Sequence, residues 1–263
     1  MNILDQIVAD KRLEVAHREK LFPISYWEQS PLFERPTHSL KAQLKADKIG
    51  IIAEHKRRSP SKAVIKQTES VAHVATAYTE AGASGLSILT DGKYFGGSLD
   101  DLVQARAATD LALLRKEFIV APYQLIEAKA HGADAVLLIA AVLSKKEIQT
   151  LSVQAQDLQL EVLLEVHNQE ELDKALMPSL DLIGVNNRNL KTFAVGLETS
   201  MELAPYIPDE FVKVSESGIS DPTAVRNLHS YGYQGFLIGE HFMKGADIQR
   251  ETAKFIAACR ASN

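Results

Sequence analysis

A carboxylate and a lysine stand together where the first long apolar run of this chain ends. Residues 49–53 read Ile-Gly-Ile-Ile-Ala, which predicts a buried strand, and Glu54, His55 and Lys56 follow it directly. Because side chains alternate along a strand, Glu54 and Lys56 share one face and His55 takes the other. An acid beside a base at the end of a buried strand is typical of a site for proton transfer or for a charged ligand. A strand that runs out into a solvated, charged loop explains this stretch equally well.

Four later apolar runs end in polar side chains that are in phase with the run. These polar side chains are Lys116, Glu165, Asn186 with Arg188, and Glu216, and the apolar Phe118 shares a face with Lys116. An isolated buried charge is costly. Charged residues that end several strands in matching phase are therefore better explained by one shared site, in which they pair, than by separate contacts with solvent. Lys213 does not fit this pattern, because the alternation directs it to the opposite face.

Apolar runs alternate with helix-forming segments, and this alternation predicts parallel strands that are each followed by a helix. Counting the first, the runs cover residues 49–53, 86–89, 111–120, 135–140, 161–166, 182–186, 211–215 and 235–239. Eight strand–helix units favour a (β/α)8 TIM barrel, an α/β fold in which chemistry takes place at the carboxyl ends of the strands. The alternative is an open doubly wound sheet, which is disfavoured because no Gly-x-Gly-x-x-Gly motif follows the first strand.

A helical extension is expected before the first strand. Apolar residues at helical spacing predict a helix over residues 3–20. Pro23, Pro31 and Pro36 interrupt the chain after it, and a second short helix is expected over 39–45. No linker-like segment breaks the rhythm that follows. We therefore expect residues 1–263 to form a single barrel domain, of which residues 1–47 are an N-terminal helical extension.

The composition narrows the classes of protein to which the chain can belong. It has 263 residues, a net charge of −5 and a single cysteine, Cys259. An acidic chain has no basic bulk to attract nucleic acid, so we expect no nucleic-acid partner. A single thiol excludes an internal disulfide framework and suits a reducing compartment. The sequence has no signal peptide and no apolar run of membrane-spanning length, so we expect no membrane association and a cytoplasmic location.

Glycines after the last two apolar runs favour a phosphate site. Ser217-Gly218 and Gly239-Glu240 stand where barrels of this kind commonly bind phosphate, beside a short extra helix that we expect over 241–244. Glu240 would repel a phosphate if it pointed inward, so we expect its side chain to point away. No histidine pair has the spacing of zinc ligands, and we expect no metal.

Together, these residues resemble the indole-3-glycerol phosphate synthase family. The resemblance covers nearly the whole chain and depends on the motifs IAEHKRRSPS, LTDGKYFGGSLDDL, LLRKEFIVAPYQ, GADAVLLI, LLEVH, IGVNNRNLKTF, VSESGI and FLIGEHFM. It implies a (β/α)8 barrel with a helical N-terminal extension. It also implies a carboxy-lyase of tryptophan biosynthesis that needs no cofactor. Such an enzyme closes the ring of 1-(2-carboxyphenylamino)-1-deoxyribulose 5-phosphate with loss of CO2 and water.

The resemblance also implies roles for individual residues. Lys116 resembles the general acid that acts on the carbonyl oxygen, Glu165 the second proton-transfer group, and Lys56 the lysine that meets the substrate carboxylate. Glu54, Asn186 and Glu216 resemble the residues that hold and orient these groups. The expected substrate contacts are Ser59, Arg188, Ser217, Gly218, Gly239 and Glu240 at the sugar phosphate, and Phe95, Phe118, Leu137 and Leu190 at the aromatic ring. Glu240 stands where serine is frequent in the family.

Two other functions stay open as alternatives. A related phosphosugar barrel, such as phosphoribosylanthranilate isomerase, needs an acid and a base but not two lysines at the first and third strands. A non-catalytic barrel that binds a phosphorylated ligand would need Arg188 and the glycines but not Lys116 and Glu165. We expect a small phosphorylated substrate, a loop over residues 59–68 that closes over it, and a monomer, with a weak homodimer as the alternative.

Overall fold

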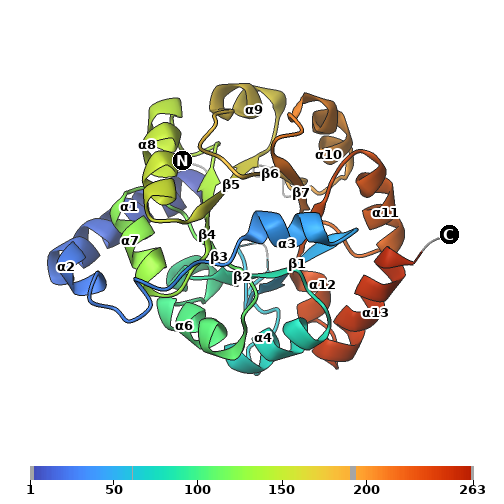
Figure 1. The fold of residues 1–263 in the computed structure, drawn as a ribbon, viewed down its shortest axis with the longest axis horizontal. Helices are drawn as coiled ribbons and strands as arrows, with labels where there is room; N and C mark the ends of the chain where they lie inside the picture. Colours follow the sequence, from blue (N-terminus) through green and yellow to red (C-terminus); the bar gives the residue numbers. More distant parts are fainter. Residues whose placement is uncertain (1–2, 61, 190–193, 262–263) are drawn as a thin grey trace.

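The computed structural model describes residues 3–60, 62–189 and 194–261, which form a closed barrel of eight parallel strands (Figure 1). The strands are β1 (Gly50–His55), β2 (Gly85–Leu89), β3 (Leu113–Lys116), β4 (Ala135–Ile139), β5 (Glu161–Val166), β6 (Leu182–Asn186), β7 (Val212–Glu216) and β8 (Gly235–Ile238). Strand β1 closes the barrel, because Ile52 stands opposite Gly85 of β2 and Leu237 of β8. The prediction of a (β/α)8 barrel is confirmed. The third run is the least accurate prediction, because only Leu113–Lys116 of residues 111–120 form a strand.

One longer helix follows each strand and contributes to the outer layer. These helices are α4 (Val71–Glu80), α6 (Leu99–Ala108), α7 (Tyr123–Ala130), α8 (Lys145–Asp157), α9 (Gln169–Ala175), α10 (Glu198–Leu203), α11 (Pro222–Ser230) and α13 (Ile248–Arg260). Short polar side chains define where several of them begin: Ser70, Ser98 and Asn168 each accept a hydrogen bond from a backbone N–H in the first turn. Such caps satisfy N–H groups that have no partner within the helix.

Three shorter helical segments lie between these elements. Helix α5 (Gly92–Phe95) follows β2, the 3-10 helix η1 (Ala204–Tyr206) follows α10, and α12 (Glu240–Met243) follows β8. The expected short helix after the eighth strand is therefore present, although it begins one residue earlier than predicted. Helix α5 was not predicted. It lies within the motif LTDGKYFGG, where three glycines and an aspartate suggest a turn, and Asp91 caps it.

The apolar residues of the strands are buried on both faces. Ile51 faces the helix layer and Ile52 faces the barrel interior, and both are fully buried. The inner cluster includes Leu114, Leu163 and Val214. Burial on both faces explains why the strands are near-continuous apolar runs instead of alternating apolar and polar residues.

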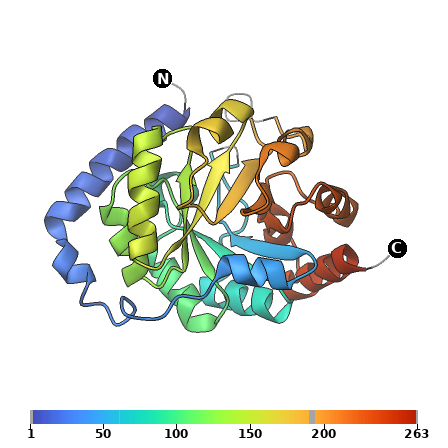
Figure 2. The same ribbon diagram turned by 45° about the horizontal axis from the view of Figure 1, so that its top comes forward.

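The N-terminal extension contains three helices, α1 (Ile3–Leu21), α2 (Ile24–Trp27) and α3 (Leu40–Ala46). Leu40 and Leu44 of α3 belong to the inner cluster of the barrel. In Figure 2, α3 lies at one end of the barrel, whereas the start of α1 lies at the end toward which the arrows of β5 and β6 point. Helix α2 was not predicted, because Pro23 reads as a break. Pro23 in fact stands directly before the first residue of α2.

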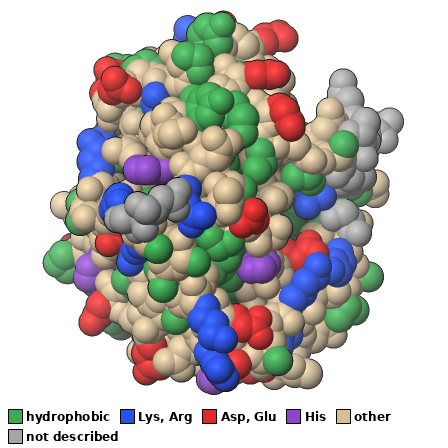
Figure 3. All heavy atoms as spheres, turned by 90° about the vertical axis from the view of Figure 1, so that its right-hand side faces the viewer, with side chains coloured by type: hydrophobic (Ala, Val, Ile, Leu, Met, Phe, Trp, Pro, Cys, Tyr) green, Lys and Arg blue, Asp and Glu red, His purple; other side chains and the backbone are tan. Residues whose placement is uncertain are grey.

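Charges of both signs are distributed over the surface. On the face shown in Figure 3, lysine and arginine side chains are interspersed with aspartate and glutamate. The single cysteine, Cys259, is buried in α13. Among the described residues, no helix has both the length and the apolar character needed to cross a membrane.

Candidate active site

A cavity of about 440 Å³ opens at the carboxyl ends of the strands, and nearly all the candidate residues line it. These are Glu54, Lys56, Ser59, Phe95, Lys116, Phe118, Leu137, Glu165, Asn186, Arg188, Glu216, Ser217, Gly218, Gly239 and Glu240. Leu190 lies outside the described residues. The polar ends of separate strands therefore meet in one cavity, which was the central geometric expectation from the sequence.

Lys116, at the end of β3, lies between two carboxylates inside this cavity. Its Nζ is 3.2 Å from Oε2 of Glu165, at the end of β5, and donates a hydrogen bond to Oε2 of Glu216, at the end of β7. Gly184 on β6 leaves the space that Glu216 occupies, because a Cβ at that position would lie 2.3 Å from Oε1 of Glu216. Lys116 and its two carboxylate partners therefore come from strands that lie far apart in the sequence.

Lys56 and Glu54 form a second pair at the end of β1. Nζ of Lys56 lies 2.5 Å from Oε1 of Glu54, so the prediction that the two share a face is confirmed. Gly239 after β8 makes room for this carboxylate: a Cβ there would lie 2.5 Å from Oε1 of Glu54. His55 points the other way and is buried, as the alternation requires.

Burial and neighbouring charge separate the pKa values of these groups. Burial alone would lower the pKa of Lys116, but the carboxylates of Glu216 and Glu165 outweigh it and raise that pKa. Burial raises the pKa of Glu216 to about 7. Burial also disfavours the charged form of Glu165, but Lys116 and then His167 lower its pKa. The cavity therefore holds an ammonium proton donor beside one ionised carboxylate and one that exchanges its proton near neutral pH.

The far side of the cavity, formed by the loops after β6, β7 and β8, has the features expected of a phosphate site. Ser217 and Gly218 both have positive φ, at 68° and 77°. A non-glycine residue in this region is uncommon and recurs at ligand sites. The backbone N–H of Arg188 donates to Oδ1 of Asn186 at 3.0 Å, which orders the start of the loop after β6.

The expectation that Glu240 points away from the cavity was wrong. Glu240 lines the cavity, and its Oε1 lies 2.9 Å from Nζ of Lys62 and 2.6 Å from Nζ of Lys244. Hydrogen bonds from Lys244 and Lys62 lower the pKa of Glu240 to about 2. The two lysines neutralise the carboxylate, which explains how it is tolerated at this position.

The opposite side of the cavity is apolar. The rings of Phe95 and Phe118 lie beside each other with centroids 6.0 Å apart, and Leu137 of β4 contributes to the same cavity. Ile3, Leu4 and Ile7 of α1 also line the cavity. These three residues were not predicted to line the site, because nothing in the sequence of the extension indicates that it takes part in the site. Their helical spacing gives one apolar face but does not say what that face covers.

His167 is a further residue that the sequence analysis did not assign. Its Nε2 lies 3.5 Å from Oε1 of Glu165, and its Nδ1 lies 3.1 Å from Oε2 of Glu171. Burial alone would lower the pKa of His167, but Glu171 and Glu165 outweigh it and raise that pKa. The imidazole therefore stands behind the candidate proton-transfer carboxylate, where its charge stabilises the ionised form of Glu165.

Within the described residues, no group of three or more histidine, cysteine, aspartate and glutamate side chains is arranged to hold a metal ion. The charged groups that line the cavity include the ammonium groups of lysines, the guanidinium of Arg188 and the carboxylates of glutamates. Such groups suit proton transfer and the binding of anions.

Comparisons with known proteins agree with this geometry. A family model described as indole-3-glycerol phosphate synthase matches residues 4–255. An indole-3-glycerol phosphate synthase from Bacteroides thetaiotaomicron is 49% identical, and the match covers 92% of this chain and 93% of the relative. The enzyme of the same name from Verminephrobacter eiseniae is 42% identical, with 97% and 99% covered.

Solved structures show the same fold at much lower identity. Thiamine phosphate pyrophosphorylase from Pyrococcus furiosus superposes with a TM-score of 0.61 at 16% identity, over 84% of this chain and 98% of the other. This likeness supports the barrel alone. The family match along nearly the whole chain goes further: the chain belongs to the indole-3-glycerol phosphate synthase family.

Proposed function

We propose that this cavity closes the indole ring of 1-(2-carboxyphenylamino)-1-deoxyribulose 5-phosphate, with Lys116, Glu165 and Lys56 as its proton-transfer and charge-binding groups. Membership of the family gives the activity, the synthesis of indole-3-glycerol phosphate in tryptophan biosynthesis. The single observation that supports the residue assignment is the position of Lys116, whose ammonium group lies in the cavity between Glu165 and Glu216.

Lys116 acts as the general acid of the ring closure. The aryl carbon that carries the carboxylate forms a bond to the carbonyl carbon of the ribulose chain, and the carbonyl oxygen takes a proton from Nζ of Lys116. Because the neighbouring carboxylates raise the pKa of Lys116, the lysine is protonated before the reaction begins. A positioned general acid typically contributes about 10²–10⁴-fold in rate.

The loss of CO2 and of water follows from the charge that ring closure creates. Bond formation leaves a positive charge on the anilino nitrogen, which carboxylates in the cavity stabilise. When CO2 leaves, the electron pair of the broken bond neutralises that charge and restores the aromatic ring. The former carbonyl oxygen then departs as water after it takes a second proton, and Glu165 removes a proton from the adjacent carbon.

Binding at both ends holds the flexible substrate in a reactive shape. Lys56 meets the substrate carboxylate until it leaves as CO2. We assign the phosphate to the loops that carry Ser59, Arg188, Ser217, Gly218, Gly239 and Glu240, and the aryl ring to the apolar side with Phe95, Phe118 and Leu137. Proximity of the two reacting carbons then replaces a costly conformational search.

Turnover of two substrates by the purified protein tests this proposal. We expect the carboxyphenylamino substrate to give indole-3-glycerol phosphate, followed by the appearance of indole fluorescence. A related isomerase would instead convert N-(5-phosphoribosyl)anthranilate, and a non-catalytic binding barrel would convert neither compound. Turnover of the isomerase substrate alone, or of neither, would show that the proposal is wrong.

The proposal includes a cytoplasmic protein that acts as a monomer, with a weak homodimer as the alternative. One buried cysteine suits a reducing compartment. Lys56, Lys116 and Glu165, to which the proposal assigns the chemistry, all line one cavity within a single copy of the chain. Sedimentation at micromolar concentration distinguishes the monomer from the dimer.

A further inference from the structure

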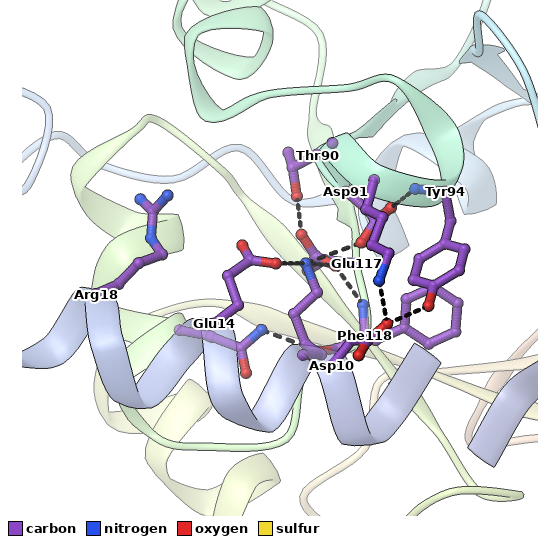
Figure 4. Close-up of polar contacts among 12 residues, drawn as sticks. Asp10, Glu14, Arg18, Thr90, Asp91, Tyr94, Glu117 and Phe118 are labelled. Carbon is purple, nitrogen blue, oxygen red and sulfur yellow. Dashed lines mark hydrogen bonds and ion pairs between the residues drawn. The ribbon is translucent and has the colours of Figure 1, made fainter. Parts of the chain in front are cut away.

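Lys11 of helix α1 is a buried lysine that contacts three carboxylates. Its side chain is 2% exposed, and its Nζ lies 2.8 Å from Glu14, 2.9 Å from Asp91 and 3.2 Å from Glu117. Figure 4 shows the three carboxylates converging from α1 and from the segments after β2 and β3. Burial alone would lower the pKa of Lys11, but Glu117 and Asp91 outweigh it and raise that pKa. The lysine is therefore charged, and it joins the extension to two loops of the active-site face.

Asp91 contacts both Lys11 and the backbone of Phe95, one of the two aromatic residues at the cavity. Oδ2 of Asp91 contacts Lys11, while Oδ1 accepts hydrogen bonds from the backbone N–H groups of Tyr94 at 2.6 Å and Phe95 at 3.2 Å. The carboxylate thus caps α5 and fixes the backbone from which the Phe95 side chain enters the cavity.

Glu117 contacts both Lys11 and the backbone of Phe118, the other aromatic residue at the cavity. Its Oε1 contacts Lys11 and also accepts a hydrogen bond from the backbone N–H of Phe118 at 2.9 Å. Its Oε2 accepts a hydrogen bond from Oγ1 of Thr90 at 2.8 Å. Glu117 is 4% exposed and directly follows Lys116 in the chain, so it has little freedom to move without shifting its neighbours.

We propose that Lys11 is a positioning residue for the aromatic side of the active site, where it sets the separation of Phe95 and Phe118 by bridging Asp91 and Glu117. The proposal rests on the proposed function, in which the aryl ring of the substrate binds beside these two side chains. Without the ammonium group, Asp91 and Glu117 are buried carboxylates that repel each other. The guanidinium of Arg115, 3.8 Å from Oε2 of Glu117, contacts Glu117 but does not bridge it to Asp91. We therefore expect one carboxylate to shift, which disturbs the backbone of α5 or of residue 118.

A purely mechanical role for Lys11 makes a different prediction, and Arg12 supplies the matched control. Arg12 is the next residue of α1, and its guanidinium lies 3.0 Å from Glu147 of α8, also joining the extension to the barrel. Among the described residues, Arg12 forms no hydrogen bond or ion pair with Asp91 or Glu117. If Lys11 only fastened the extension, Lys11→Met and Arg12→Met would have similar effects on ligand binding.

The experiment measures the affinity of two ligands, indole-3-glycerol phosphate and glycerol 3-phosphate, which lacks the aromatic ring. We expect Lys11→Met to weaken binding of indole-3-glycerol phosphate by about tenfold, as the loss of aromatic contacts implies. Binding of glycerol 3-phosphate stays unchanged in this variant. Lys11→Arg restores most of the lost affinity, and Arg12→Met changes neither ligand.

Other results would overturn the proposal. They are an unchanged affinity of Lys11→Met for indole-3-glycerol phosphate, or an equal loss for both ligands. If Lys11→Met does not fold, Asp91→Asn takes its place, because asparagine also caps helices but carries no charge. It is expected to show a smaller loss of the same selectivity, and equal loss for both ligands would again contradict the proposal. Failure of the wild-type protein to bind the product or turn over its substrate would instead overturn the proposed function.

Discussion

At the scale of single residues, we propose that the reaction depends on Lys116, Glu165 and Glu216, which line one cavity. Lys116 keeps its proton because Glu216 and Glu165 are adjacent, and Glu165 stays ionised because Lys116 and His167 are adjacent. Neither property belongs to one side chain alone. The substitution of one member is therefore expected to alter the protonation of the others.

Lys116→Met tests the role of the proton donor. The substitution keeps most of the side-chain volume but removes the acid, and we expect kcat to fall about 10²–10⁴-fold, the usual contribution of general acid catalysis. Circular dichroism should show an intact barrel. Lys146→Met serves as the matched control, because Lys146 is an exposed lysine of α8 that does not line the cavity. A near-normal kcat for Lys116→Met would contradict the role of Lys116.

His167→Ala tests whether the histidine stabilises the ionised form of Glu165. The charge of His167 lowers the pKa of Glu165, so its removal raises that pKa. A base with a higher pKa is protonated over a wider acidic range. The acidic limb of the kcat/KM profile should therefore move to higher pH, and activity should be lost first in acid. His17→Ala, an exposed histidine of α1, should leave the profile unchanged. An unmoved acidic limb in His167→Ala argues against this role.

Strand alternation predicts the face on which several of these residues lie, but it does not predict which side chains they contact. Lys116, Glu165 and Glu216 are in phase with buried runs, so the sequence places them at one rim once a barrel is assumed. The alternation says nothing about Lys11 or His167. Lys11 reads as one charge among many on an amphipathic helix, and its three carboxylates come from segments up to 106 residues away in sequence, as the Lys11–Glu117 contact shows. That pairing appears only when the extension has docked.

At the scale of elements, the regular units of the barrel follow from sequence periodicity, whereas the short helices do not. Helices α2 and α5 are four residues each, too short to show a helical repeat. The contacts of Lys213 are a second feature that sequence periodicity does not predict. It lies on the outer face of β7, where its Nζ donates to the carbonyl oxygen of Ala204 at 3.1 Å and contacts Asp209 at 3.4 Å. A buried lysine is acceptable there because carbonyl and carboxylate oxygens partner its charge.

Lysines of the loop after β1 contact oxygen atoms of the segment after β8. The substitution Glu240→Gln tests how one of these contacts affects substrate binding. Lys62 and Lys66 contact Glu240 and the carbonyl oxygen of Gly245, respectively. The lowered pKa of Glu240 keeps it ionised at neutral pH, and we propose that it competes with the substrate phosphate for Lys62 and Lys244. We expect Glu240→Gln to lower KM at low salt, with a smaller difference at high salt because ions screen exposed charges.

The matched control for this loop is Glu210→Gln, an exposed glutamate before β7 at the other end of the barrel. It makes the same change in net charge and should leave KM unchanged. A KM for Glu240→Gln that is equal to or above that of the wild type would show that Glu240 does not compete with the phosphate.

At the scale of the whole molecule, we propose that the extension and the barrel form one domain. Leu40 and Leu44 of α3 share the apolar cluster inside the barrel, and α1 contributes residues to the active-site cavity. The indole N–H of Trp27 in α2 donates to Oη of Tyr123 in α7 at 2.7 Å. Contacts at both ends of the barrel and along its side favour folding as one unit.

Trp27 reports on this proposal directly, because it is the only tryptophan of the chain and lies in the extension. Far-ultraviolet circular dichroism reports mainly on the barrel. For one cooperative unit, denaturant unfolding followed by tryptophan fluorescence and by circular dichroism should give the same midpoint. A fluorescence transition at clearly lower denaturant would mean that the extension unfolds separately.

We propose that Lys116, Glu165 and Lys56 act together on one ligand whose phosphate and ring bind at opposite sides of the cavity. A crystal structure with indole-3-glycerol phosphate bound would locate both ends of this ligand. We expect the phosphate at the Ser217-Gly218 and Gly239 loops, and the indole beside Phe95 and Phe118. The former carbonyl carbon, C3 of the indole, should face Lys116. A product bound outside this cavity, or in it with the indole at the Ser217-Gly218 loop, would show that these residues do not act together in this way.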